Sequence, residues 1–197
     1  AHSAWAAQAE ADAVLRPFGN ESAAAADAWR AVRAKIDDYF TRCRLAAFDA
    51  TSGALRSFNP NVNSNVNDLA VSGDTLYLAG AFTVVSNQLR SRLAAVNAGT
   101  GALLPWAPSV ELEAHAIVAP NGPIVVGGKF QTLNDTAVEG LGAVDPVTGA
   151  TVPWAANQII GNYGPDAYIN SHSTNGNLVF GTGITYLVNN EPTSVTD

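Results

Sequence analysis

The sequence of 197 residues is poor in lysine and in sulfur-containing side chains. Lysine occurs only as Lys35 and Lys129, methionine is absent, and Cys43 is the single cysteine. One cysteine excludes an internal disulfide, and a lone cysteine is more often an inert thiol than a reactive one, even beside two arginines. No apolar run approaches the ~20 residues that a membrane-spanning helix requires.

Positive charge is scarce in the larger part of the chain. Residues 1–44 carry six acidic and six basic side chains, whereas residues 45–197 carry eleven acidic and four basic ones and therefore the whole net charge of −7. An acidic segment of this kind repels phosphate backbones, so nucleic-acid binding is not expected. The change in charge near residue 44 predicts two parts of different kind.

Motifs of the common catalytic classes are missing as well. The sequence has no Gly-x-Ser-x-Gly, no HExxH, no phosphate-binding Walker loop and no CxxC. Its three histidines, His2, His115 and His172, show no metal-ligand spacing. We therefore expect no catalytic residues, no metal and no cofactor.

The first 43 residues favour helices. Residues 3–15 are rich in alanine, and Pro17 and Gly19 would end any helix that forms there. A second helix is predicted for about residues 22–42, because apolar residues recur there at spacings of three and four, at Trp29, Val32, Ile36 and Tyr39 or Phe40. This segment either packs on its own chain or uses Trp5 and Trp29 to anchor the protein in a larger complex.

From residue 44 the sequence repeats itself with a period of 48. Residues 44–58, 92–106 and 140–154 read RLAAFDATSGALRSF, RLAAVNAGTGALLPW and GLGAVDPVTGATVPW. A second block recurs as LYLAGAF at 76–82, IVVGGKF at 124–130 and LVFGTGI at 178–184. The third copy of this block lies about six residues later than a strict repeat would place it. Such a period indicates an array of similar supersecondary units.

Each repeat is predicted to contain four short antiparallel strands. In the first repeat these are Val66–Val71, Leu76–Val85, Arg92–Asn97 and Ala102–Trp106, with a bulge or close packing at Gly80 and a polar loop at Ser86–Ser91. Sheets of this kind stack radially as propeller blades.

The predicted fold is mainly β, with about three four-stranded blades in an incomplete ring behind a short helical segment. The helical segment covers residues 1–43 and the repeat domain residues 44–190. The units lie near 44–91, 92–139 and 140–188, and a polar tail follows at 191–197.

Two residue types recur at fixed places in the repeats. Asp49, Asn97 and Asp145 begin a turn in which their oxygens are expected to accept backbone N–H groups, while a following glycine supplies positive φ. Each repeat closes with its largest side chain, Phe58, Trp106 or Trp154. These aromatic residues are predicted to wedge between blades, where burial is worth on the order of 2–3 kcal/mol.

Asparagine recurs at every second position in FNPNVNSNVNDLAV, residues 58–71. Alternating oxygen ligands are typical of calcium loops, but this run lacks the central glycine and the terminal glutamate of such loops. The period of the repeat places the run in the connection between two blades, where asparagine amides bond to local backbone. We therefore interpret it as a structural connection.

The repeat resembles two families of bacterial propellers. Ala79-Gly80-Ala81-Phe82, followed by Arg90-Ser91-Arg92-Leu93-Ala94, is similar to the secreted repeat often labelled delta-60. Ala143-Val144-Asp145-Pro146-Val147-Thr148-Gly149, followed by Trp154, is similar to the docking motif A-x-D-x-x-T-G-x-x-x-W of pyrroloquinoline-quinone-like repeats, with the aromatic residue one position later. The other copies depart further from that motif, at Ser52, Phe58 and Asn97.

The resemblance covers about residues 44–188. It implies a propeller in an exported bacterial protein that is secreted, periplasmic or at the cell surface, with no single activity attached.

The extra residues of the third repeat are the main candidate binding site. Residues 161–177 read GNYGPDAYINSHSTNGN and are expected to form a loop that presents Tyr163, Asp166, Tyr168 and His172. Aromatic and polar residues on such a loop suit a sugar or a peptide. A longer surface connection would have the same composition.

His115, beside Glu111 and Glu113, is a second candidate. It belongs either to a set of ligands facing a central channel or to the solvated start of a strand. The two glutamates lie on one face of a strand and could pair as acid and base, although the sequence supplies no partner for them.

These features favour a non-catalytic binding or structural propeller module of an exported bacterial protein, with a protein or carbohydrate partner held by blade loops. The alternatives are a fragment of a quinoprotein-type oxidoreductase or other propeller enzyme, and a subunit of a larger complex anchored by the N-terminal helices. Because three blades cannot form a ring, further blades or another chain are expected to close it, unless the helical segment and the tail cap an open arc.

Overall fold

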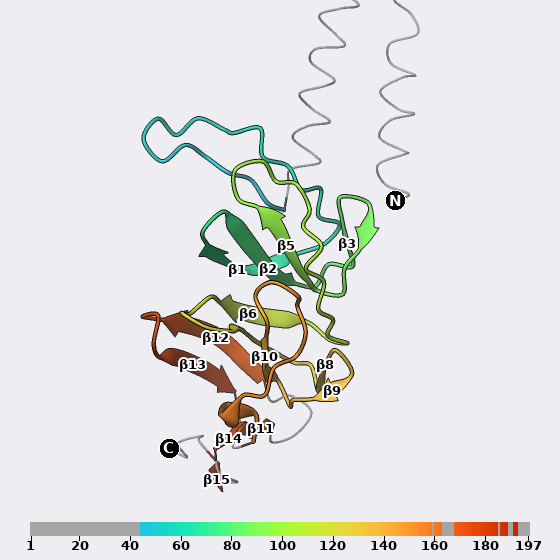
Figure 1. Ribbon diagram of the computed structural model, residues 1–197, viewed down its shortest axis with the longest axis vertical. Helices are drawn as coiled ribbons and strands as arrows, with labels where there is room; N and C mark the ends of the chain where they lie inside the picture. The colour runs from blue at the N-terminus through green and yellow to red at the C-terminus, as the bar shows by residue number, and fades with distance from the viewer. Residues whose placement is uncertain (1–43, 159, 163–167, 185, 189–190, 193–197) are drawn as a thin grey trace, which may run out of the picture. The chain divides into compact units, whose positions relative to one another are not determined.

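The structure is a computed structural model that describes residues 44–158, 160–162, 168–184, 186–188 and 191–192. The chain separates into two compact units between Thr41 and Arg42, and the described residues belong to the second. The predicted helices, with Trp5, Trp29 and Cys43, and residues 193–197 of the predicted tail lie outside the described residues. The described part is mainly β, in several small antiparallel sheets (Figure 1). It contains no helix long and apolar enough to cross a membrane.

The first sheet has the order β1-β2-β5 and is antiparallel throughout. A short hairpin, in which β3 and β4 have two residues each, lies between β2 and β5 in the sequence. The strands are β1 (Val66–Ser72), β2 (Thr75–Gly80), β3 (Val84–Val85), β4 (Gln88–Leu89) and β5 (Leu93–Asn97).

The second sheet has the same construction, one repeat further along the chain. Its central strand β7 pairs with β6 and β10 on either side, and a two-residue hairpin β8–β9 again precedes the third strand. The strands are β6 (Ala114–Val118), β7 (Ile124–Gly128), β8 (Thr132–Leu133), β9 (Thr136–Ala137) and β10 (Leu141–Val144). Isolated bridges also recur with the 48-residue period: Val96 pairs with Leu103, and Val144 pairs with Thr151.

The third sheet has two described strands, β12 (Tyr168–Thr174) and β13 (Val179–Ile184). A bulge in β12 between Ile169 and Ser171 corresponds to the bulge in β6 between Ala114 and Ala116. Ile169 is therefore the counterpart of Ala114, although a strict repeat would place that counterpart seven positions earlier. The bulges thus indicate seven extra residues, where the LVFGTGI match indicates about six. The difference matters because a shift of one residue moves every side chain of a strand to the other face.

The remaining elements flank this third sheet along the chain. A 3₁₀ helix, η1 (Ala155–Gln158), follows Trp154. A small sheet of order β11-β14-β15 contains β11 (Ile160–Asn162), β14 (Tyr186–Val188) and β15 (Glu191–Pro192).

Residues 45–56 form a separate hairpin, here named the Phe48 hairpin. Phe48 pairs with Leu55, and the N–H of Asp49 donates to the carbonyl of Ala54 at 2.8 Å. The same backbone bond joins Asn97 to Ala102 and Asp145 to Ala150. The hairpin is therefore the counterpart of the outer strands of the first and second sheets.

Several strand limits differ from the predictions. The predicted strand Leu76–Val85 ends at Gly80, and residues 84–85 pair instead with β4 inside the predicted polar loop Ser86–Ser91. The predicted strand Ala102–Trp106 is reduced to the single bridge at Leu103. The predicted loop at 161–177 is wrong for most of its length, because it contains the end of β11 and the whole of β12.

Backbone approach at one glycine explains why β2 stops at Gly80. A Cβ there would lie 2.1 Å from the carbonyl oxygen of Asn65, and at Gly128 it would lie 2.3 Å from that of Glu113. The N–H of Ala81 donates to the Asn65 carbonyl at 2.9 Å, so the chain leaves the strand there to bond to its neighbour. The close packing predicted at Gly80 is confirmed.

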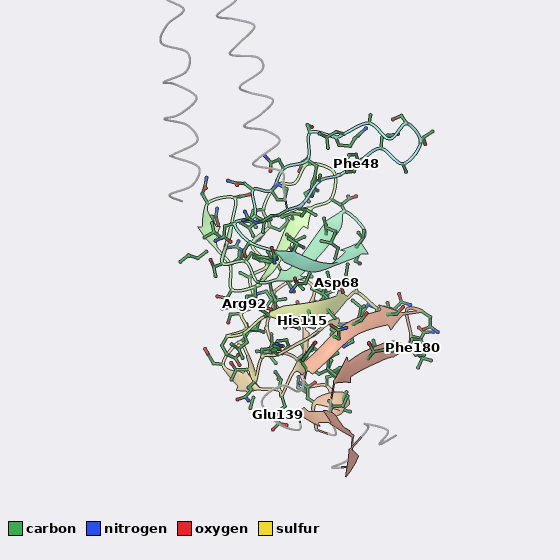
Figure 2. The ribbon with its side chains drawn as sticks, turned by 180° about the vertical axis from the view of Figure 1, so that it is seen from behind. Phe48, Asp68, Arg92, His115, Glu139 and Phe180 are labelled. Carbon is green, nitrogen blue, oxygen red and sulfur yellow. The ribbon has the colours of Figure 1, made fainter. Side chains whose placement is uncertain are left out.

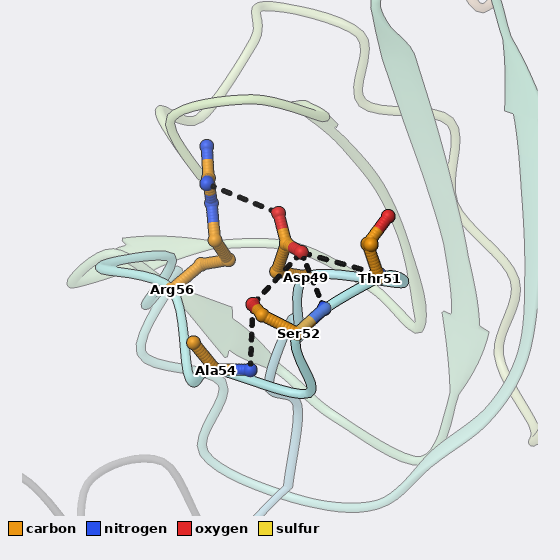
Figure 3. A network of polar contacts seen from close by, with 5 residues as sticks. All are labelled: Asp49, Thr51, Ser52, Ala54 and Arg56. Atoms are coloured by element: carbon orange, nitrogen blue, oxygen red, sulfur yellow. Dashed lines mark hydrogen bonds and ion pairs between the residues drawn. The ribbon is translucent and has the colours of Figure 1, made fainter.

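The predicted turn chemistry is also confirmed. Oδ1 of Asp49 accepts hydrogen bonds from the N–H groups of Thr51 and Ser52 and from the Ser52 hydroxyl, at 3.2, 2.9 and 2.9 Å (Figure 3). Asn97 and Asp145 accept the equivalent three bonds in their own turns. These bonds lower the pKa of Asp49 and of Asp145, the backbone N–H of Ser52 or of Thr148 contributing most. The glycine that follows has φ of 69° to 75° at Gly53, Gly101 and Gly149.

Two of the three aromatic residues that close the repeats are buried. Phe58 and Trp106 are 2% and 3% exposed, and Trp154 is partly buried. Trp106 meets Tyr77 edge to face with ring centroids 5.0 Å apart, and its Nε1 donates to the carbonyl of Asp145 at 2.9 Å. Each of the first two therefore packs against the turn of the following repeat, Phe58 at Gly101 and Trp106 at Gly149.

Candidate functional site

The candidate site is a polar and aromatic cluster where β6 and β12 lie side by side. The ring of Tyr168, the first residue of β12, lies 4.9 Å from the imidazole of His115 on β6, centroid to centroid. Lys129, directly after β7, places its Nζ 5.0 Å from the centroid of the same ring. Glu113, directly before β6, completes what we name the Tyr168 cluster, and Figure 2 shows His115 in the middle of the stacked sheets.

The Tyr168 cluster contains one buried nitrogen without a hydrogen bond. Nε2 of His115 has no donor or acceptor within reach among the described residues, although the carboxylate of Glu113 lies 3.8 Å away. The His115 side chain is only 19% exposed, whereas that of Glu113 is 52% exposed. Burial lowers the pKa of His115, Glu113 opposes this effect and Lys129 adds to it. His115 is therefore neutral at pH 7.

His172 lies further along β12 and faces a different space. Together with Ile169, Trp154 and Val179 it lines a cavity of about 540 Å³ between the second and third sheets. A Cβ at position 127 would lie 2.5 Å from Cε1 of His172, so Gly127 provides the room for the imidazole. Burial lowers the pKa of His172 to about 4, although Asp68 acts in the opposite direction.

The bulge in β12 separates the two predicted site residues that the structure describes. Residues 168 and 172 would share a face of a regular strand, because side chains alternate. The extra residue between Ile169 and Ser171 reverses the alternation, so His172 joins Ile169 at the cavity while Tyr168 joins His115. Tyr163 and Asp166, the other two predicted residues, lie outside the described residues.

Comparison of the chain with protein-family models, with curated proteins and with solved structures finds no match.

The two glutamates proposed as an acid–base pair have separate roles. The carboxylate of Glu111 accepts hydrogen bonds from the N–H groups of Gln131 and Thr132 and from the Thr132 hydroxyl. Burial raises the pKa of Glu111, but these bonds outweigh it and the net pKa is lowered. Glu111 therefore fixes the turn after β7, and Asn63 bonds to Thr83 and Val84 in the same way one repeat earlier.

The asparagine run bonds within the protein. The amide nitrogen of Asn67 donates to the carbonyl of Ala114 on β6 at 2.9 Å, and Oδ1 of Asn59 accepts the N–H of Asn61 at 3.2 Å. Next to the run, Oδ2 of Asp68 accepts the N–H of Ile117 at 2.8 Å and thereby links β1 to β6. In the described part of the chain, no three His, Cys, Asp or Glu side chains are grouped closely enough to hold a metal ion.

Lys129 is the functional candidate that the sequence argument missed. Its side chain is exposed, and it follows the glycine pair Gly127-Gly128 that ends β7. The rarity of lysine could have drawn attention to it, because Lys129 is the only lysine after residue 35.

Proposed function

We propose that the repeat domain is part of a β-propeller and acts as a non-catalytic binding module of an exported bacterial protein. The regular spacing of the sheet pairings, the aromatic residue buried against each following turn and the adjacent inner strands β1, β6 and β12 support a radial stack. Export is inferred from the resemblance to secreted repeats alone.

The chemistry of the Tyr168 cluster favours a neutral, hydroxyl-rich ligand, that is, an oligosaccharide. Lys129 and Glu113 carry opposite charges and His115 is neutral, so the cluster attracts neither anions nor cations strongly. Tyr168 supplies an aromatic surface, while the exposed side chains of Lys129 and Glu113 supply a donor and an acceptor for hydroxyl groups. The observation that carries the proposal is the Tyr168 ring with Lys129 Nζ 5.0 Å from its centroid and the exposed Glu113 in the same cluster.

Binding without turnover follows from the placement of the carboxylates. Hydrolysis of a glycosidic bond usually requires two carboxyl groups that flank the bond. Glu113 faces the Tyr168 cluster, but Glu111 is held by the Gln131–Thr132 turn. The described residues therefore bring one carboxylate to the cluster.

Binding to immobilised neutral oligosaccharides tests the proposal. The 197-residue chain should retain one class of glucose-, galactose- or N-acetylglucosamine-based chains without cleaving it, and Tyr168→Ala should weaken that binding at least about tenfold. Gln88→Ala, at an exposed site on β4, is the matched control and should bind as the parent does. Absence of binding, equal binding by Tyr168→Ala, or release of shortened sugars would each contradict the proposal.

A further inference from the structure

The described array begins and ends with incomplete sheets. In the first two sheets the central strand pairs on both sides, β2 with β1 and β5, and β7 with β6 and β10. Among the described residues β13 pairs with β12 alone. At the other end, the Phe48 hairpin has the form of the outer strands but no described inner strands of its own.

Both ends expose apolar side chains whose counterparts are buried. Phe48 and Leu55 are 63% and 51% exposed, whereas Val96 and Val144, the counterparts of Phe48, are 0% exposed. Phe180 on β13 is 56% exposed, although its counterparts Tyr77 and Val125 are buried. Figure 2 shows that Phe48 and Phe180 lie at opposite ends of the stacked sheets.

The pairing register shows how the two ends fit together. In the first sheet Ala95 lies opposite Tyr77 and Val96 opposite Leu76, and β10 pairs with β7 at the equivalent positions. Because Ile169 is the counterpart of Ala114, the residues of β13 that correspond to Tyr77 and Leu76 are Phe180 and Val179. A Phe48 hairpin in this position would therefore place Ala47 opposite Phe180 and Phe48 opposite Val179.

This placement would also fill the cavity between the second and third sheets. Directly opposed residues of an antiparallel pair point to the same face, so Phe48 would point with Val179 into the 540 Å³ space. The turn Asp49–Gly53 would cover Trp154 as Asp145–Gly149 covers Trp106. The cavity therefore has the position and the apolar lining expected of a seat for this hairpin.

We propose that the Phe48 hairpin of a second copy of this chain pairs with β13, and that the exchange is reciprocal. The inference rests on the radial stack proposed above. The described residues of one copy supply two complete sheets and two complementary incomplete ones. The described residues of two copies would together supply six sheets, within the range of about four to eight that closed propellers use. A head-to-tail contact then closes with two-fold symmetry and pairs the free edge of β13.

Mass measurement in solution tests the proposal first. The 197-residue chain should have about twice its 20.4 kDa mass by light scattering at micromolar concentration. Phe48→Asp should give the single-chain mass, and it should still fold because Phe48 is exposed within one copy. Leu89→Asp is the matched control, since Leu89 is 81% exposed on β4 and away from both incomplete sheets, and should stay a dimer.

A cross-link tests the register independently of folding. In a Cys43→Ser background, the pair Phe48→Cys and Val179→Cys should form disulfide-linked dimers, because opposed Cα atoms lie ~4.5–5.5 Å apart. Phe48→Cys with Phe180→Cys should cross-link at least tenfold less, because Phe180 alternates with Val179 on β13 and does not line the cavity. A parent chain of single mass, open polymers, equal cross-linking by the two pairs, or pairing of β13 with sequence beyond residue 197 would overturn the proposal.

Sugar binding separates this inference from the proposed function. A single-mass parent chain that binds the oligosaccharides would overturn only the exchange of hairpins. A dimeric chain that binds none of them would overturn only the ligand.

Discussion

Among single residues, Asn97 offers the simplest test of the turn chemistry. Asn97→Ala removes the acceptor for the N–H groups of Gly99 and Thr100 and for the Thr100 hydroxyl. We expect the free energy of unfolding to fall by about 1–2 kcal/mol in urea titrations. Asn97→Asp is the control, because aspartate makes the same bonds at positions 49 and 145, and it should cost less than about 0.5 kcal/mol. Equal losses for the two variants would contradict this role of the side chain.

His172 makes stability depend on pH. Its pKa is about 4 in the folded protein because the imidazole is buried, against a value of about 6.5 in the unfolded chain. The unfolded chain therefore takes up the proton first, and stability that is complete above pH 6.5 is lost as the pH falls towards 4. The loss is on the order of 2–3 kcal/mol, and it should be absent from His172→Gln. Chemical denaturation at a series of pH values measures it, and an NMR titration of His172 centred near pH 6.5 would contradict it.

The roles of single residues could be predicted where their partners are close in the sequence. Asp49, Asn97 and Asp145 bond two and three residues ahead, so the local pattern was sufficient. The Tyr168 cluster joins residues from β6, β12 and the end of β7, and only the pairing of strands brings them together. The bulge in β12, which decides that Tyr168 and His172 face different ways, leaves no mark in the alternation of residue types.

At the scale of elements, Gly80 controls the junction of β2 with its neighbour. Gly80→Ala would place a Cβ 2.1 Å from the carbonyl oxygen of Asn65, which is main chain and cannot turn aside. We expect a loss of about 3 kcal/mol or more in the free energy of unfolding, measured by thermal or urea denaturation. Gly122→Ala is the matched control, because a Cβ there meets no atom within 4 Å, and it should change stability by less than about 0.5 kcal/mol. A mild effect at Gly80 would mean that the two chain segments can separate.

The strands themselves were largely predictable, and their limits were not. Alternation and turn residues located β1 and β5 to within a residue or two. The break after Gly80 depends on the carbonyl of Asn65, which is bonded to Ala81 from a distant part of the sequence. The third repeat was harder, because the extra residues shift the register and β12 occupies a segment whose glycine and asparagine content suggests a loop.

At the scale of the whole molecule, reciprocal exchange of hairpins predicts that thermal stability depends on concentration. Association stabilises the folded state by mass action, so a hundredfold dilution should lower the melting temperature of the parent chain. The melting temperature of Phe48→Asp should not change on dilution. Differential scanning fluorimetry over that range provides the measurement, and a parent chain whose melting temperature is constant would contradict the prediction.

The burial of each closing aromatic residue against the following turn has a consequence for biosynthesis. Gly101 lies almost one full repeat after Phe58, and Gly149 lies equally far after Trp106. At roughly 5–20 residues per second, a ribosome takes about 2–9 s to synthesise the segment that covers each ring. The nascent polypeptide therefore carries one uncovered aromatic surface at a time, which moves towards the C-terminus as translation proceeds and is available to a chaperone during each interval.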